Sequence, residues 1–160
     1  MGSVLVANLP YYISTAILSQ IFESERFARA TFLVQREVAE RLTAKAGDEA
    51  YGFFSALTAM YGQARIVRHV PKGAFLPAPD VTSSIVRIDL TGQKPEPGLL
   101  AVLEAAMAHR RKTLRNNLKA AGYLEEKIDR ALKQMGLSPT IRGEVLGLEQ
   151  LGELYRSLSS

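Results

Sequence analysis

The sequence contains no cysteine among its 160 residues. Without thiols the chain can form neither a disulfide nor a thiolate metal site, and a catalytic cysteine is excluded. Histidine is scarce as well: the two present, His69 and His109, lie 40 positions apart, which is a poor basis for a metal site. We therefore predict no metal centre.

No apolar stretch is long enough to cross a bilayer, and no segment resembles a signal peptide. We interpret the protein as cytoplasmic, without a membrane partner. The net charge of +4 comes from 20 basic and 16 acidic residues and is only a mild bias toward polyanions. With 47% apolar and 22% charged residues, the composition is that of a chain that can bury a core.

The spacing of apolar residues in the first 90 positions predicts an α/β layered sheet. Short apolar or alternating runs indicate strands, and runs with helical spacing separate them. The last two strands are joined by a Pro- and Gly-rich loop without a helix, so we expect them to form an antiparallel pair. The strands are predicted at 4–9, 29–35, 63–70 and 81–90, and the helices at 14–24, 36–44 and 51–62.

A linker at 91–98 separates this region from a stretch that reads as entirely helical. We predict two domains, 1–92 and 93–160. The expected helices of the second are 99–122, with a possible break near 109–112, then 124–136 and 148–158. Four strands make a small sheet. If this one is half of a larger sheet, the missing half should precede residue 4.

The segment "ANLPYY" follows the first strand and carries an unusual set of side chains. An exocyclic amine on a heteroaromatic ring is a poor nucleophile, and a site that accepts both of its N–H hydrogens favours a more nucleophilic nitrogen. The Asn8 side-chain oxygen and the Pro10 carbonyl can be those two acceptors. Tyr11 offers a face on which a base can stack. Asn and Pro also dominate ordinary turns, so a plain turn stays open as an alternative.

Basic residues concentrate between 109 and 133, where eight cations face three acidic residues. On a continuous helix, Arg111 and Arg115 are four positions apart, and Lys112 and Lys119 follow an adjacent track. Leu103, Met107, Leu114, Leu118 and Ala121 would form the apolar stripe opposite. Such a helix docks with one face and presents cations for phosphate binding with another. An ordinary solvated charged face is the alternative.

Three segments together resemble the rRNA adenine N6-dimethyltransferase family. "NLPYYIST" has the form of the motif (D/N)-(P/I/L)-P-(Y/F) of amino-group methyltransferases. "FLPAPDVTSSIVRIDL" resembles the family's late motif, in which Phe75 stands on a Pro-stiffened loop. "HRRKTLRNNL" resembles a signature in the C-terminal helical domain of the bacterial small-subunit members. The matches extend over nearly the whole chain and occur in the same order.

The resemblance implies the C-terminal half of a Rossmann-like S-adenosylmethionine-dependent methyltransferase sheet, followed by a small all-α domain. The parent enzyme would dimethylate N6 of two adjacent adenosines near the 3′ end of 16S rRNA in the small ribosomal subunit. Asn8, Pro10, Tyr11 and Phe75 would be the catalytic set, with the base sandwiched between Tyr11 and Phe75. Contact with rRNA would fall to Arg110, Arg111, Lys112, Arg115 and Lys119.

Members of the family hold S-adenosylmethionine with a glycine-rich loop after their first strand, and no such loop precedes Asn8 here. Asn8 is then the one family position left that lies against the methyl donor. We therefore expect an N-terminally truncated chain that is inactive alone and self-associates through an exposed edge of its sheet. A non-catalytic RNA-binding or ribosome-assembly module is the rival interpretation.

Overall fold

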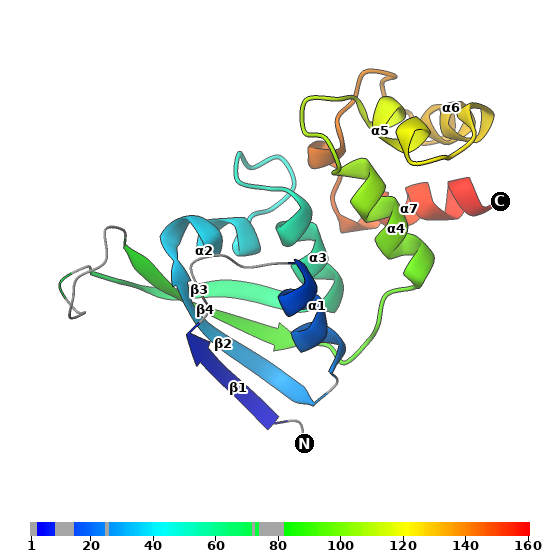
Figure 1. The fold of residues 1–160 in the computed structure, drawn as a ribbon. Coiled ribbons are helices and arrows are strands. Elements are labelled where there is room, and N and C mark those ends of the chain that lie inside the picture. The colour runs from blue at the N-terminus through cyan, green and yellow to red at the C-terminus, as the bar shows by residue number, and fades with distance from the viewer. Residues whose placement is uncertain (1–2, 9–14, 25, 72, 74–81) are drawn as a thin grey trace. The chain divides into compact units, whose positions relative to one another are not determined.

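The computed structural model describes residues 3–8, 15–24, 26–71, 73 and 82–160, and every structural statement below concerns these residues. The chain divides into two compact units (Figure 1). The sheet unit consists of Met1–Ala44 and Thr58–Lys94, and the helical unit of Lys45–Leu57 and Pro95–Ser160. Each unit is described by itself.

The sheet unit contains a mixed four-stranded sheet in the order β1-β2-β4-β3. Strand β1 pairs with β2 in parallel, whereas β4 pairs antiparallel with both β2 and β3. The predicted strands and the antiparallel last pair are thus confirmed, in an α/β arrangement. The strands are β1 (Ser3–Asn8), β2 (Phe27–Gln35), β3 (Gly62–Val70) and β4 (Ser83–Leu90), and the helices between them are α1 (Thr15–Glu23), α2 (Arg36–Thr43) and α3 (Phe53–Tyr61).

Alternation along β2 and β4 gives the sheet two different faces. One face is fully buried, because every second side chain in the central strands points into the core. Its members are Ala30, Phe32, Val34, Val86 and Ile88, all at most 4% exposed. The residues between them, including Thr31, Leu33 and Ile85, are only half-buried. A single sheet therefore has one closed face and one face that is largely open.

The helical unit is built from short amphipathic helices around a leucine-rich core. Helix α4 packs on α5 and α7, and α6 packs on α5 and α7. Leu103, Leu114, Leu118, Leu151 and Leu154 are fully buried between them. The elements are α4 (Pro97–Ala106), α5 (Leu114–Ala120), α6 (Glu125–Gln134), the 3-10 turn η2 (Gly143–Val145) and α7 (Leu148–Ser159).

Residues 45–57, which include the first half of α3, belong to the helical unit although they precede β3 in the sequence. The buried Tyr51 hydroxyl donates a hydrogen bond to the Leu146 carbonyl at 2.7 Å, which anchors this segment beside η2. The same burial raises the pKa of Tyr51. The sequence placed this segment in the first predicted domain, 1–92. The two predicted domains, 1–92 and 93–160, stay a prediction.

The long helix expected at 99–122 is broken between α4 and α5. Thr113 caps the start of α5 by accepting a hydrogen bond from the Asn116 N–H. The buried Asn117 side chain donates to the carbonyls of Ala106 and His109, at 3.1 and 3.0 Å. Such partners satisfy carbonyls at a helix end and stabilise the break. The helical spacing assumed between Arg111 and Arg115 is consequently wrong.

Candidate functional site

Asn8 is the last residue of β1, and its side chain is exposed. It occupies the carboxyl end of a strand that runs parallel to its neighbour, the place where open α/β sheets bind ligands. An exposed amide in this position is available to a ligand. The other three predicted catalytic residues, Pro10, Tyr11 and Phe75, lie outside the described residues.

The strand register brings the two predicted motif segments to one end of the sheet. Asn8 is aligned with Leu33 of β2, and Leu33 is aligned with Ile85 of β4, so the three residues form one row. Neighbouring strands lie about 4.8 Å apart, which separates the ends of this row by roughly 10 Å. The Arg36 N–H donates to the Thr82 carbonyl at 2.9 Å, which ties the start of β4 to the end of β2. Asn8 at the end of β1 and Thr82 before the start of β4 thus lie at the same end of the sheet.

The amide of Asn8 is suited to orienting an amine and not to moving a proton. Its oxygen accepts hydrogen bonds and its nitrogen donates them, and neither atom titrates near neutral pH. The two aligned residues, Leu33 and Ile85, are apolar.

A nucleoside-type cofactor does not fit the described residues of this chain as they stand. Such a group needs a backbone loop for its charged end and an acceptor for its ribose hydroxyls. At the end of β1 the described residues supply only Asn8, with apolar Leu33 and Ile85 beside it. A complete cofactor site requires groups beyond these.

A second candidate site is the cationic turn, His109–Lys112, between α4 and α5. The Lys112 N–H donates to the His109 carbonyl at 3.0 Å and closes the turn, with Arg110 and Arg111 at its centre. Arg110 donates to the Glu49 carbonyl at 2.6 Å. Within the described part of the chain, the exposed side chains of Arg111 and Lys112 have no ion-pair or hydrogen-bond partner. The turn therefore presents two free cations to solvent.

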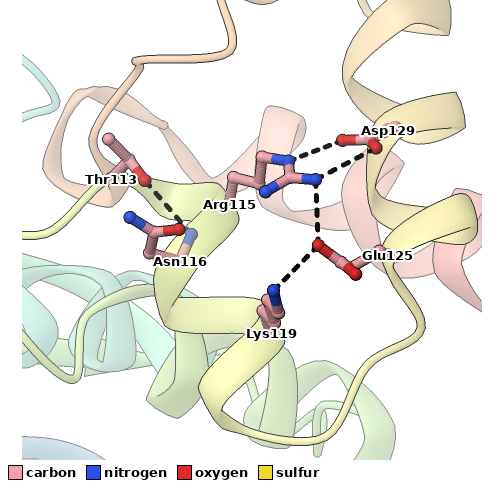
Figure 2. Close-up of polar contacts among 6 residues, drawn as sticks. All are labelled: Thr113, Arg115, Asn116, Lys119, Glu125 and Asp129. Atoms are coloured by element: carbon pink, nitrogen blue, oxygen red, sulfur yellow. Dashed lines mark hydrogen bonds and ion pairs between the residues drawn. The ribbon is translucent and has the colours of Figure 1, made fainter.

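Arg115 and Lys119 differ, because both are engaged with α6 (Figure 2). The Arg115 guanidinium binds Asp129 at 2.8 Å and Glu125 at 3.1 Å, and the Lys119 ammonium binds Glu125 at 2.9 Å. Hydrogen bonding from Arg115 lowers the pKa of Asp129, and hydrogen bonding from Lys119 lowers the pKa of Glu125. A polyanion would therefore have to compete with Glu125 and Asp129 for Arg115 and Lys119.

A hydrogen bond between His69 and Ser84 in the sheet unit was not predicted from the sequence. The His69 Nδ1 atom lies 2.6 Å from the Ser84 hydroxyl, across the β3–β4 pair. Because Ser84 is fully buried, this hydroxyl cannot meet a substrate, and the pair joins the two strands. No signal in the linear sequence links residues 15 positions apart on two strands.

Within the described residues no three histidine or carboxylate side chains gather as metal ligands would. The same part of the chain contains no helix with the length and apolar character needed to span a bilayer.

Comparison with known proteins gives one consistent family. The family model described as "Ribosomal RNA adenine dimethylase" matches residues 3–144. A relative named "Ribosomal RNA small subunit methyltransferase A" from Deinococcus radiodurans is 49% identical over 159 residues, covering 98% of this chain and 54% of the relative. The protein of the same name from Lactococcus lactis subsp. lactis is 40% identical over 162 residues, covering 96% of this chain and 55% of the relative.

Solved structures support the fold. A dimethyladenosine transferase from Plasmodium falciparum matches with a TM-score of 0.75 at 23% identity, over 95% of this chain and 65% of that one. The 23S rRNA methyltransferase ErmE matches with a TM-score of 0.71 at 21% identity, over 98% of this chain and 65% of that one. The chain spans about half the length of the curated relatives that it matches.

Proposed function

The chain belongs to the ribosomal RNA adenine dimethylase family, and on this premise we propose that it is the substrate-side, C-terminal portion of an enzyme that dimethylates N6 of two adjacent adenosines of 16S rRNA. Members of this family use S-adenosylmethionine, which supplies the methyl group when bound. The described residues offer that cofactor only Asn8, so the 160-residue chain alone should not turn over. An activity directed at ribosomes would be cytoplasmic.

Asn8 carries the proposed chemistry of the sheet unit. Its exposed side-chain oxygen would accept one N–H of the adenine amine, and the Pro10 carbonyl would accept the other. Two acceptors draw the amine toward a tetrahedral, more nucleophilic geometry. Tyr11 and Phe75 would stack on the two faces of the base, and this stacking would offset the cost of unstacking the base from the RNA. The row formed by Asn8, Leu33 and Ile85 supports this role, because it aligns the end of β1 with the first residues of β4, the strand that the late motif enters.

The helical unit would hold rRNA through the cationic turn. Arg111 and Lys112 are exposed and unpaired, so they can neutralise phosphates without first breaking an ion pair. Arg110, Arg115 and Lys119 belong to the same proposed surface, although each already has a partner in the chain. We expect these three to contribute less.

The experiment that tests the proposed function is reconstitution. The chain is combined with the part of the Deinococcus radiodurans enzyme that it does not cover, together with S-adenosylmethionine and unmethylated small subunits. Transfer of labelled methyl groups to adenine is expected, with a loss of at least about 100-fold in Asn8→Ala, since removal of a single positioned hydrogen-bond donor or acceptor costs catalysis this much. Asn116→Ala, an exposed asparagine of the helical unit, is the matched control.

The alternative function is a non-catalytic RNA-binding or ribosome-assembly module. The two unpaired cations of the cationic turn favour it, because they need no cofactor to act. This alternative would be supported if the reconstituted wild-type protein binds small subunits tightly and transfers no methyl group to them.

The isolated chain is also proposed to self-associate through β1. This strand lies at the edge of the sheet, and its unpaired backbone groups can bind a further strand. Sedimentation should show dimers or larger species that grow with protein concentration. A clean monomer at high concentration would contradict this proposal.

A further inference from the structure

One side of the sheet is exposed or half-buried across its whole width. Counted from β1, its first members are Val4, Val6, Thr31, Leu33 and Ile85, and we refer to these five residues as the open face. Toward β3, the edge strand opposite β1, the same side becomes basic (Figure 1). We refer to its four basic residues as the arginine cluster: Arg29 of β2, Arg87 of β4, and Arg65 and Arg68 of β3.

A β-bulge in β3 places Arg68 in the arginine cluster. Arg65 and Arg68 are three positions apart, and in a regular strand such residues point to opposite faces. The register shifts between Ile66 and Arg68, so that Val67 is the extra residue and Arg68 is aligned with Ile85 of the open face. Bulges redirect side chains in this way. This one brings together two arginines that regular pairing would separate.

Positive charge in the arginine cluster is only partly compensated. Arg29 and Arg87 both bind the Asp89 carboxylate, at 3.1 and 3.0 Å. Hydrogen bonds from Arg87 and Arg29 lower the pKa of Asp89, so this carboxylate is charged at neutral pH. The exposed side chains of Arg65 and Arg68 have no hydrogen-bond or ion-pair partner among the described residues. Along the described strands of this side, four guanidinium groups thus face one carboxylate.

The arginine cluster also contains a repulsive contact. Arg65 and Arg87 are directly opposite each other across the antiparallel β3–β4 pair. Like charges in this position destabilise a sheet. An arrangement that costs stability is typical of residues that serve binding, and an anion bound between the two guanidinium groups would remove the repulsion.

The sugar-phosphate backbone of RNA is the anion that fits this cluster best. A guanidinium group presents a planar fork that binds phosphate through two hydrogen bonds. The backbones of neighbouring strands are about 4.8 Å apart, and three residues of a strand span roughly 10 Å, so the cluster is wider than one small ion. A nucleic acid carries a charge at every nucleotide, so successive phosphates can each meet an arginine.

We propose that the arginine cluster is a second phosphate-binding surface of the chain, which binds the backbone of rRNA in addition to the cationic turn. Contacts to phosphate fix the position of the RNA and do not read its sequence. Arg65 and Arg68 would contribute most, because Arg29 and Arg87 already share Asp89. The inference rests on the proposed function for the choice of rRNA as the partner.

The test measures the affinity of the purified chain for a fluorescent oligoribonucleotide from small-subunit rRNA, by anisotropy over a range of salt concentrations. Arg65→Gln combined with Arg68→Gln should weaken binding about tenfold at moderate salt and reduce the slope of log affinity against log salt by roughly 1–2. Both side chains are exposed, so this variant should fold, and its circular dichroism checks that it does.

Two control variants separate phosphate contact from net charge and from structure. Arg36→Gln combined with Arg41→Gln removes the same charge from α2, where each arginine is paired with a glutamate of its own helix, and should leave the slope unchanged. Arg65→Lys combined with Arg68→Lys keeps the charge. It should retain the slope and weaken binding only about threefold, because lysine binds phosphate without the fork geometry.

The contribution of the cationic turn is measured in the same assay. The two surfaces belong to different units, so their effects should add. A chain that lacks the charges of Arg111 and Lys112 should still bind RNA with a residual salt dependence. Replacing Arg65 and Arg68 by glutamine in that chain should lower the slope again by roughly 1–2.

Three outcomes would overturn the proposal. The first is a slope that the glutamine variant of Arg65 and Arg68 does not change, which would assign the cluster to solvent or to an acidic protein. The second is an equal change in the α2 control, and the third is an equal change in the lysine variant. The slope is measured without cofactor. A reconstituted enzyme that transfers no methyl group would therefore contradict the proposed function and leave the arginine cluster supported if the slope falls as expected.

Discussion

The helical unit and the sheet unit bury their apolar side chains to different extents. In the helical unit the leucines that face the core, such as Leu103 and Leu154, are fully buried, whereas Leu124 and Leu148 are exposed at its surface. In the sheet unit one face is closed to the same degree, whereas Val6 on the other face is 75% exposed. The largest difference between the two units is thus at β1, where an apolar side chain on one face of the sheet remains in contact with solvent.

Polar groups are distributed differently in the two units. The helical unit pairs part of its charge internally, as in the network of Arg115, Glu125 and Asp129, and leaves Arg111 and Lys112 of the cationic turn without a partner among the described residues. The sheet unit leaves Asn8 exposed at the end of β1 and carries an excess of arginines beside the open face.

The largest effect that tests this contrast is expected for Phe32→Ala. Phe32 is fully buried on the closed face, and its truncation should lower the free energy of unfolding by about 3–5 kcal/mol. Leu33→Ala, one residue away on the open face, should cost about 1 kcal/mol or less, because part of that side chain is already in water. Urea unfolding followed by circular dichroism measures both. Equal losses would show that the open face is covered in solution.

The second-largest effect is expected in the helical unit, where Asn117→Ala should lower the free energy of unfolding. The side chain is 2% exposed and donates to the carbonyls of Ala106 and His109. Its removal leaves two acceptors unsatisfied and should cost about 1–3 kcal/mol of unfolding free energy. The neighbouring Asn116→Ala is exposed and should change stability by about 0.5 kcal/mol or less. If Asn116→Ala cost as much stability as Asn117→Ala, the hydrogen bonds of Asn117 would not be what stabilises the break between α4 and α5.

A smaller effect is expected from Arg111→Ala combined with Lys112→Ala. Loss of two phosphate contacts should weaken binding to an rRNA fragment about tenfold at moderate salt and reduce the slope of log affinity against log salt by roughly 1–2. The matched control combines Lys127→Ala with Lys133→Ala, which removes the same charge from α6. Equal changes in the slope would indicate that net charge, and not the cationic turn, governs binding.

The smallest effect concerns pH. Asp129 and Glu125 have pKa values below their ordinary ones in the folded chain, because Arg115 and Lys119 bind their charged forms. Between the folded and unfolded pKa values the unfolded state binds more protons. Their stabilisation is therefore complete above about pH 5 and is lost as the pH falls below about 4. In Asp129→Asn the midpoint of urea unfolding should fall less between pH 6 and pH 3 than in the wild type. An identical pH dependence would contradict the role of this ion pair.

The fold was predicted from the sequence wherever local periodicity carried the information. The four strands and most helices follow from the spacing of apolar residues, with bounds that differ by a few positions, and the antiparallel last pair follows from the loop without a helix that joins the two strands. The helix predicted at 99–122 is two helices, α4 and α5. The break near 109–112 was also indicated. The consequence for Arg111 and Arg115 was missed, because a helical phase cannot be carried across a break whose position is set by the caps at Thr113 and Asn117.

The candidate site was predicted in its residue types and only in part in its geometry. Asn8 was placed correctly at the end of a strand, and the structure describes it as exposed. The pairing of Arg115 with Asp129 could not be predicted, since the two residues come from different helices whose packing decides the distance. The roles of Pro10, Tyr11 and Phe75 stay predictions.

By itself the sequence determined the order of the elements, the chemical character of the segment at Asn8 and the concentration of cations after α4, because each of these depends on neighbouring residues. The tertiary structure alone decided which of those cations remain unpaired, that residues 45–57 fold with the helical unit and that Val4 and Val6 lie on an uncovered face. Those outcomes depend on side chains that are distant in sequence and meet only when strands and helices pack.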